Sequence, residues 1–121
     1  MARRVGMSVE RRHAAAAEAA LPPTVDLRPS FSPIEDQGAL GSCTANAAAG
    51  LMEYFEKHTS GAWVDASRLF VYKVERDLLG WKGDTGAFLR TAMETLVMFG
   101  APPEKYWPYN IANYDVEPPA I

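Results

Sequence analysis

The sequence predicts a mainly α fold, and three observations favour it. Apolar residues recur at the helical spacing in three separate segments. Glycine or proline interrupts the chain between those segments, as expected where helices end. The 121 residues are 48% hydrophobic, which suits one globular domain or part of a larger one. We therefore expect three amphipathic helices packed around one core.

The first twenty residues differ in composition from the rest of the chain. They contain four arginines and an alanine-rich stretch, which Pro22 and Pro23 bring to an end. The stretch lacks the continuous apolar core of a secretory signal peptide, although an organelle transit peptide stays an alternative. We expect residues 1–20 to be a flexible basic leader and residues 21–121 to form the domain. Within the domain, the proline-rich segment 21–40 predicts an extended strap.

The first helix is predicted to begin near Cys43 and to end at the Ser60–Gly61 break. Its apolar positions follow the spacing of one buried stripe, comprising Ala45, Ala48, Ala49, Met52 and Phe55. The small alanines allow another backbone to approach closely, so we expect this helix to lie in the middle of the fold. Glu53 and Lys57 fall on the opposite side and predict an exposed i, i+4 ion pair.

The second helix is predicted to start after a cap at Asp65 or Ser67 and to end at Gly80. Its apolar face comprises Phe70, Val71, Val74 and Leu78. This spacing again predicts one apolar face that packs on the core.

The third helix is predicted to run from near Thr85 to Phe99, where Gly100 ends it and two prolines prevent its continuation. Its apolar stripe comprises Leu89, Ala92, Met93, Leu96 and Val97. The tail, residues 106–121, is rich in aromatic residues and proline and shows no helical period. We expect this tail to lie as a strap over the helical core.

Charge and cysteine content exclude several classes of protein. The net charge is −3, and the arginines of the leader make the remaining chain more acidic, so the domain lacks the basic surface of a nucleic-acid-binding protein. A single cysteine excludes a disulfide-stapled scaffold, and charged residues interrupt every apolar run long enough to suggest a membrane span. Together with the missing signal core, the single cysteine favours a cytoplasmic location. No metal or organic cofactor is indicated.

The segment from Gln37 to Cys43 carries the chemical signal of the sequence. It places a thiol at the first turn of the alanine-rich helix, where free backbone N–H groups and the helix dipole favour an anion. Because the thiolate is the nucleophilic form, Cys43 is the candidate nucleophile. Gly38 and Gly41 allow a tight turn and leave space for a substrate carbonyl. The Gln37 amide is a candidate donor to the oxyanion that would form there, beside the Cys43 backbone N–H.

These residues resemble the papain-like cysteine peptidases. The family hallmark is Gln followed by Gly-x-Cys-Gly-Ser-Cys-Trp at the start of the central helix, and the matching positions here are Gln37, Gly38, Gly41, Ser42 and Cys43. Further similar segments are Asp26 to Arg28, Pro33 to Gly38, Ser67 to Phe70, Gly86 to Gly100 and Tyr106 to Tyr109. The resemblance covers roughly residues 22–110. It implies the helical left-hand lobe of the α+β papain-like cysteine proteinase fold.

Two positions depart from the family pattern, and one part of it is missing. Leu40 stands where secreted members have a disulfide cysteine, and Thr44 stands where they have tryptophan. The family's histidine and asparagine would lie about 130 to 150 residues beyond the nucleophile, in a β-rich second lobe outside this sequence. His58 does not replace that histidine, because it lies about 20 Å along the same helix. His13 lies in the leader, and no pattern brings it to Cys43.

The resemblance implies a cysteine-type peptidase that acts through a thioester intermediate. Cys43 and Gln37 would be its catalytic residues, and a histidine from the second lobe would transfer the proton. The residues implied to contact substrate are Gly41, Ser42, Gly86 and Ala87. The implied partners are a peptide or protein substrate and a complementary lobe that carries the histidine and asparagine. The 121 residues alone are not expected to turn over substrate efficiently.

Two alternatives stay open beside the peptidase. A truncated homologue would bind a partner, without catalysis, through the face that otherwise meets the second lobe. An exposed apolar patch of a few hundred square ångströms would favour this alternative. In the second alternative, the chain is one subunit of a split enzyme. Peptidase activity that appears on mixing it with a separate β-rich fragment would favour this alternative.

Overall fold

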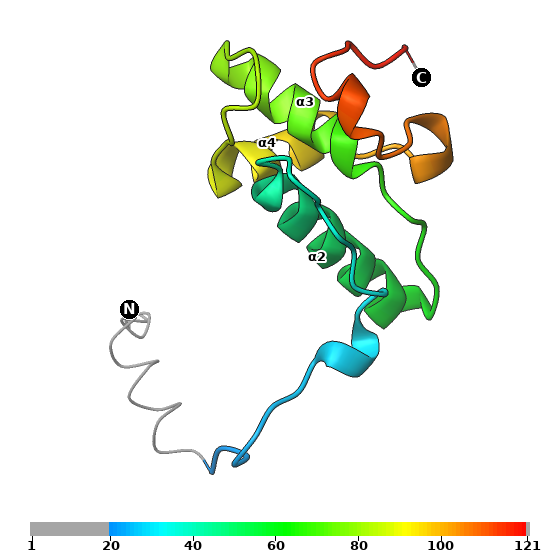
Figure 1. Ribbon diagram of the computed structural model, residues 1–121. Helices are drawn as coiled ribbons and strands as arrows, with labels where there is room; N and C mark the ends of the chain where they lie inside the picture. The colour runs from blue at the N-terminus through cyan, green and yellow to red at the C-terminus, as the bar shows by residue number, and fades with distance from the viewer. Residues whose placement is uncertain (1–19, 121) are drawn as a thin grey trace, which may run out of the picture.

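The computed structural model describes residues 20–120, and these residues are mostly helical. Three α-helices pack on one another: α2 (Cys43–Ser60), α3 (Arg68–Leu79) and α4 (Leu89–Phe99) (Figure 1). Three single-turn 3₁₀ helices lie in the connecting segments: η1 (Arg28–Ser30), η2 (Glu104–Tyr106) and η3 (Ile111–Asn113). No β-strand forms between residues 20 and 120, where one isolated antiparallel bridge joins Ala66 to Pro103. The predicted mainly α fold is confirmed.

The alanine-rich face of α2 packs against both other helices. Ala45 and Ala48 are completely buried, and they belong to one core cluster with Leu40, Leu69, Val71, Tyr72 and Ala92. Because alanine side chains are short, the α2 backbone lies close to its neighbours, as the sequence predicts.

The bounds of α2 and α3 follow the predicted breaks, whereas α4 begins later than predicted. Ser67 caps α3, with its hydroxyl oxygen accepting the Phe70 N–H at 3.2 Å. The third helix starts at Leu89 and not near Thr85. Gly83 and Gly86 adopt φ values of 81° and 71°, which interrupt a right-handed helix, so the segment before Leu89 forms a loop.

The buried faces of α3 and α4 differ from the predicted apolar stripes. Lys73, Glu75 and Arg76 are buried on α3, whereas Leu78 is exposed. On α4 the buried side chains are Thr91, Ala92 and Thr95, and the predicted core residues Leu89, Met93 and Val97 are exposed. The helical period of apolar residues locates these helices in the sequence. It does not identify the polar side chains that are buried when the helices pack.

The predicted exposed pair of Glu53 and Lys57 is wrong. Glu53 is buried, and its Oε1 accepts the Ala66 N–H at 2.9 Å. Lys57 donates to the Phe31 carbonyl at 3.0 Å. Each side chain therefore holds a connecting segment against α2, because a backbone group offers a closer partner than the opposite charge.

Both predicted straps are present in the part of the chain that the structure describes. The N-terminal strap is mostly extended, interrupted by the single turn of η1, and mostly exposed. It joins the core at Leu40, which is buried. The C-terminal strap passes beside α3 (Figure 1), and its Trp107, Tyr109 and Tyr114 pack against the core cluster. The prediction of a flexible leader falls on residues 1–19, outside the described residues. None of the described helices combines the length and the apolar character that a membrane crossing needs.

Candidate active site

Cys43 is an exposed free cysteine at the first position of α2. The first N–H groups of a helix have no partner within the helix, so the thiol lies where a negative charge is favoured. Ser42 is the N-cap, but its side chain makes no capping bond to the helix. The geometry therefore leaves the first-turn N–H groups for an anion at the sulfur or for a substrate oxygen.

The loop before Cys43 is held by bonds within itself. The Gln37 Nε2 donates to the Leu40 carbonyl at 2.9 Å, and the Asp36 Oδ1 accepts the Gly38 N–H at 2.8 Å. A carboxamide has two N–H groups, so one N–H of Gln37 remains for another acceptor. Between residues 20 and 120 no hydrogen bond joins Gln37 to Cys43 directly.

Ser42 is completely buried and supports the loop from inside the lobe. The Tyr109 hydroxyl donates to the Gln37 carbonyl at 2.8 Å, and since it has one proton, it accepts from the Ser42 hydroxyl at 2.6 Å. Asn46 donates to the Ser42 carbonyl at 2.9 Å and accepts from Arg68 at 2.8 Å. Ser42 is among the residues predicted to contact substrate; in this structure it is buried, and its side chain bonds Tyr109 within the lobe.

The structure brings Gly41 and Gly86 together. The Gly41 N–H donates to the Asp84 carboxylate at 2.9 Å, and the Gly86 N–H donates to the Tyr72 hydroxyl at 3.1 Å. Gly41, Gly86 and Ala87 are all partly exposed. The loop before the thiol and the predicted substrate-binding segment are therefore neighbours on the lobe surface.

A buried carboxylate is bonded to the residue that follows Cys43. Thr44, directly after Cys43, donates its hydroxyl proton to the Glu75 Oε1 at 2.8 Å. Glu75 is completely buried, and its Oε2 has no hydrogen-bond partner in the described chain. Burial raises the pKa of Glu75 to about 7, against the lowering effects of the Thr44 bond and the Arg76 charge. The carboxyl group is therefore partly protonated at neutral pH.

Sequence reasoning missed the supporting residues of this site, namely Tyr72, Glu75, Asp84 and Tyr109. Asp84 offered a signal, because a carboxylate in a glycine-containing turn can accept exposed backbone N–H groups. Tyr72 and Glu75 offered none, since they look like ordinary members of a helix. The supporting role of Tyr109 depends on a contact between residues far apart in the sequence.

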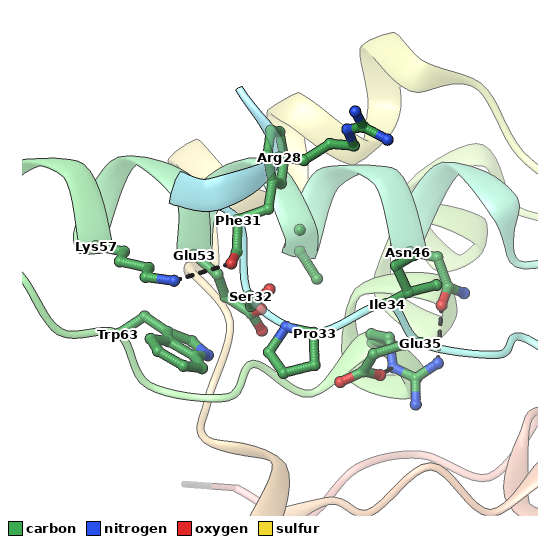
Figure 2. Close-up of a pocket in the computed structure, with 13 residues that line it drawn as sticks. Arg28, Phe31, Ser32, Pro33, Ile34, Glu35, Asn46, Glu53, Lys57 and Trp63 are labelled. Atoms are coloured by element: carbon green, nitrogen blue, oxygen red, sulfur yellow. Dashed lines mark hydrogen bonds and ion pairs between the residues drawn. The ribbon is translucent and has the colours of Figure 1, made fainter. Parts of the chain in front are cut away.

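A cavity of about 550 Å³ lies between the N-terminal strap and α2, and Cys43 does not line it (Figure 2). Figure 2 shows Lys57 reaching the Phe31 carbonyl at one end and Asn46 at the other, with Pro33 between them. The side chains that line the cavity include Glu53, Lys57 and Trp63. The described residues contain no group of three or more metal-ligating side chains here or elsewhere.

Comparisons with known proteins agree with this arrangement. The uncharacterized peptidase C1-like protein L477 of Acanthamoeba polyphaga mimivirus is 40% identical over 87 residues, 69% of this chain and 28% of that protein. Xylellain, a cysteine protease from Xylella fastidiosa, is 42% identical with a TM-score of 0.67, over 75% of this chain and 34% of that structure. A mite allergen structure, from a study of Blo t 1 and Der p 1, is 23% identical with a TM-score of 0.67. The match covers 76% of this chain and 32% of that structure. No protein-family model matches the chain.

The described residues, in which an exposed cysteine opens α2, match the helical lobe of papain-like cysteine protease structures. The chain corresponds to the N-terminal part of these matches, which include the mimivirus peptidase C1-like protein and the cysteine protease xylellain. The chain spans about a third of the length of the relatives it matches.

Proposed function

We propose that this lobe carries the nucleophile of a cysteine peptidase. The observation that carries the proposal is the exposed thiol of Cys43 at the first turn of α2, behind a loop fixed by hydrogen bonds. The similarity to cysteine proteases over this lobe supports it. The substrate class is peptides or proteins, which would bind in extended form across the surface near Gly41 and Gly86.

The proposed reaction begins with attack of the Cys43 thiolate on the scissile carbonyl carbon. A C–S bond forms and the carbonyl electrons move to oxygen, where the Cys43 N–H and the free N–H of Gln37 would stabilise the charge. Collapse of this intermediate breaks the C–N bond, and the leaving amine takes a proton from a histidine. Water then hydrolyses the thioester: its proton returns to the histidine, its OH joins the acyl carbon, and the C–S bond breaks to release the acid and regenerate the Cys43 thiolate.

The histidine would come from a complementary β-rich lobe. His58 is exposed near the far end of α2 and stacks on Tyr54 with 5.6 Å between ring centroids. That position is about 20 Å along the helix from Cys43, far beyond hydrogen-bond reach. The proposal therefore requires a histidine and its orienting asparagine on a second lobe, and it predicts little turnover by this lobe alone.

The experiment combines this chain with the C-terminal lobe of xylellain and measures cleavage of a fluorogenic peptide amide. Activity that needs both lobes is expected. Cys43→Ser should abolish it, and Gln37→Ala should lower it by roughly a hundredfold, as for loss of one oxyanion donor. A lobe complex that forms without any Cys43-dependent cleavage would refute the proposal.

A second candidate, a non-catalytic binding lobe, is supported by an apolar groove between α2 and α4. The groove has a volume of about 510 Å³, and Leu51, Phe55, Met93 and Val97 line it. These side chains are all at least partly exposed. Tight binding of a partner by the Cys43→Ser variant, with no cleavage by the wild type, would favour this candidate.

A further inference from the structure

A small hydrogen-bonded cluster joins the Gly83–Gly86 loop to the loop before α2. The Oδ1 of Asp84 accepts both the Gly41 N–H at 2.9 Å and the Tyr72 hydroxyl at 2.5 Å. The Tyr72 oxygen in turn accepts the Gly86 N–H at 3.1 Å. Two loops that are distant in the sequence are therefore connected through one carboxylate and one phenol.

The two loops approach closely at their glycines. A Cβ atom on Gly41 would lie 3.0 Å from the Asp84 Oδ1 and 3.5 Å from the Gly86 nitrogen. A Cβ atom on Gly86 would lie 3.8 Å from the Gly41 carbonyl oxygen. A side chain at position 41 would therefore crowd the Asp84 carboxylate and touch the Gly86 backbone, so the two loops lie within van der Waals range of each other.

The cluster is anchored on the buried face of α3. Tyr72 is completely buried, as is Arg76 one turn later, which donates to the Gly83 carbonyl at 2.5 Å. The Arg76 guanidinium also lies over the Tyr72 ring, 4.1 Å from its centroid. Burial, and next the bond to Asp84, raise the pKa of Tyr72 to about 12. The hydroxyl therefore keeps its proton and donates at neutral pH.

We propose that Asp84 and Tyr72 are positioning residues that set where the Gly83–Gly86 loop lies relative to the loop ending at Cys43. This inference rests on the proposed function, in which both loops face the substrate. An extended peptide is recognised by backbone hydrogen bonds, whose strength depends on the spacing of the groups that make them. Loss of the cluster weakens recognition of the peptide and leaves the thiol in place.

The test compares two alkylations of Cys43 in the full chain. The first reagent is chloroacetamide, and the second is a dipeptide that carries the same chloroacetyl group. In both, the thiolate displaces chloride and forms a thioether. The ratio of the two second-order rate constants measures peptide recognition at constant chemistry, and we expect it to be well above one. In Asp84→Ala and Tyr72→Phe the ratio should fall by roughly fivefold, equivalent to about 1 kcal/mol.

Matched variants separate positioning from general loss of structure. Asp84→Asn keeps an acceptor oxygen and should restore most of the ratio. Asp26→Ala removes another exposed carboxylate that accepts a backbone N–H, and Tyr106→Phe removes an exposed hydroxyl. Both controls should leave the ratio unchanged. Circular dichroism should show helical content equal to that of the wild type in every variant, because Asp84 is exposed and Tyr72→Phe keeps the buried ring.

The possible results separate the positioning role of Asp84 and Tyr72 from the proposed peptidase function. An unchanged ratio in Asp84→Ala and Tyr72→Phe overturns the positioning role and leaves the proposed function standing. Equal slowing of both reagents overturns it as well, because the defect would then lie at the thiol. A ratio near one in the wild-type chain removes the proposed function and, with it, this inference.

Discussion

The two ends of α2 are built in different ways. At the Cys43 end, polar side chains and backbone groups form a connected set of hydrogen bonds through Ser42, Tyr109 and Asp84. Toward the other end, α2 and α4 leave an apolar groove with exposed Phe55 and Val97. Directional bonds fix atoms in place, whereas an apolar surface stabilises only when something covers it. The first end is therefore fixed in place, as the proposed reaction requires, whereas the second presents an apolar surface that another surface could cover.

The largest effect on stability is expected for Arg76, which connects α3 to the Gly83–Gly86 loop and to the C-terminal strap. Arg76 is completely buried, pairs with Asp115 at 2.8 Å and donates to the carbonyls of Gly83 and Tyr114. Arg76→Met removes the donor to both carbonyls and to Asp115, which keeps its bond from the Gly83 N–H, and should cost about 3 kcal/mol or more of unfolding free energy. Urea denaturation measures the change. Arg90→Met, at an exposed position of α4, should change it by less than about 0.5 kcal/mol.

A smaller effect, dependent on pH, is expected for Glu75. Its pKa in the folded lobe is raised to about 7 from an ordinary 4.5, so the folded state binds the proton more tightly than the unfolded state. Stability is therefore highest below about pH 4.5 as far as this group is concerned, and falls as the pH rises from there through about 7.

Glu75→Gln imitates the protonated carboxyl group and should remove this fall. Near pH 8 the variant should be more stable than the wild type by on the order of 2 kcal/mol, with little difference near pH 4. Urea denaturation across this range gives the comparison. Parallel stability curves for the two proteins would contradict the assignment of a raised pKa to Glu75.

Tyr109→Phe should have a still smaller effect at the Cys43 end. The change removes one hydroxyl that bonds both the Ser42 side chain and the Gln37 carbonyl. A loss of about 1 to 2 kcal/mol is expected, because the Gln37 carbonyl loses its Tyr109 donor and the Ser42 hydroxyl loses its acceptor, while Ser42 still accepts from Asn46 at 3.0 Å. Thermal unfolding measures it, with Tyr106→Phe as the exposed control. Equal, negligible effects in both variants would show that the bonds around Ser42 do not hold the loop.

The smallest effect on stability is expected in the groove. Val97 is 86% exposed, so Val97→Lys should change the unfolding free energy by less than about 0.5 kcal/mol. The same change should clearly weaken association with a complementary lobe, if that lobe covers the groove. A decrease of more than about 1 kcal/mol in the unfolding free energy of the isolated chain would mean that Val97 belongs to the core. The far end of α2 would then not carry a free apolar groove.

Much of the fold could be predicted because helical period and glycine breaks are local signals. The ends of α2 and α3 follow such signals, and the spacing from Gln37 to Cys43 located the thiol at a helix start. The start of α4 was missed because two glycines with positive φ extend the preceding loop. Buried Glu53 and Glu75 were missed for a different reason. Their partners, a distant backbone N–H and a threonine hydroxyl, are known only once the helices are packed.

The central claim is that the start of α2 makes Cys43 a better nucleophile than an ordinary cysteine. The most direct measurement is its rate of alkylation by chloroacetamide at pH 7, in the folded chain and in the same chain unfolded by urea. The account predicts that the folded chain reacts faster by about tenfold or more, since only the folded state offers the helix N-terminus. A folded-state rate equal to or below that of the unfolded chain would contradict it.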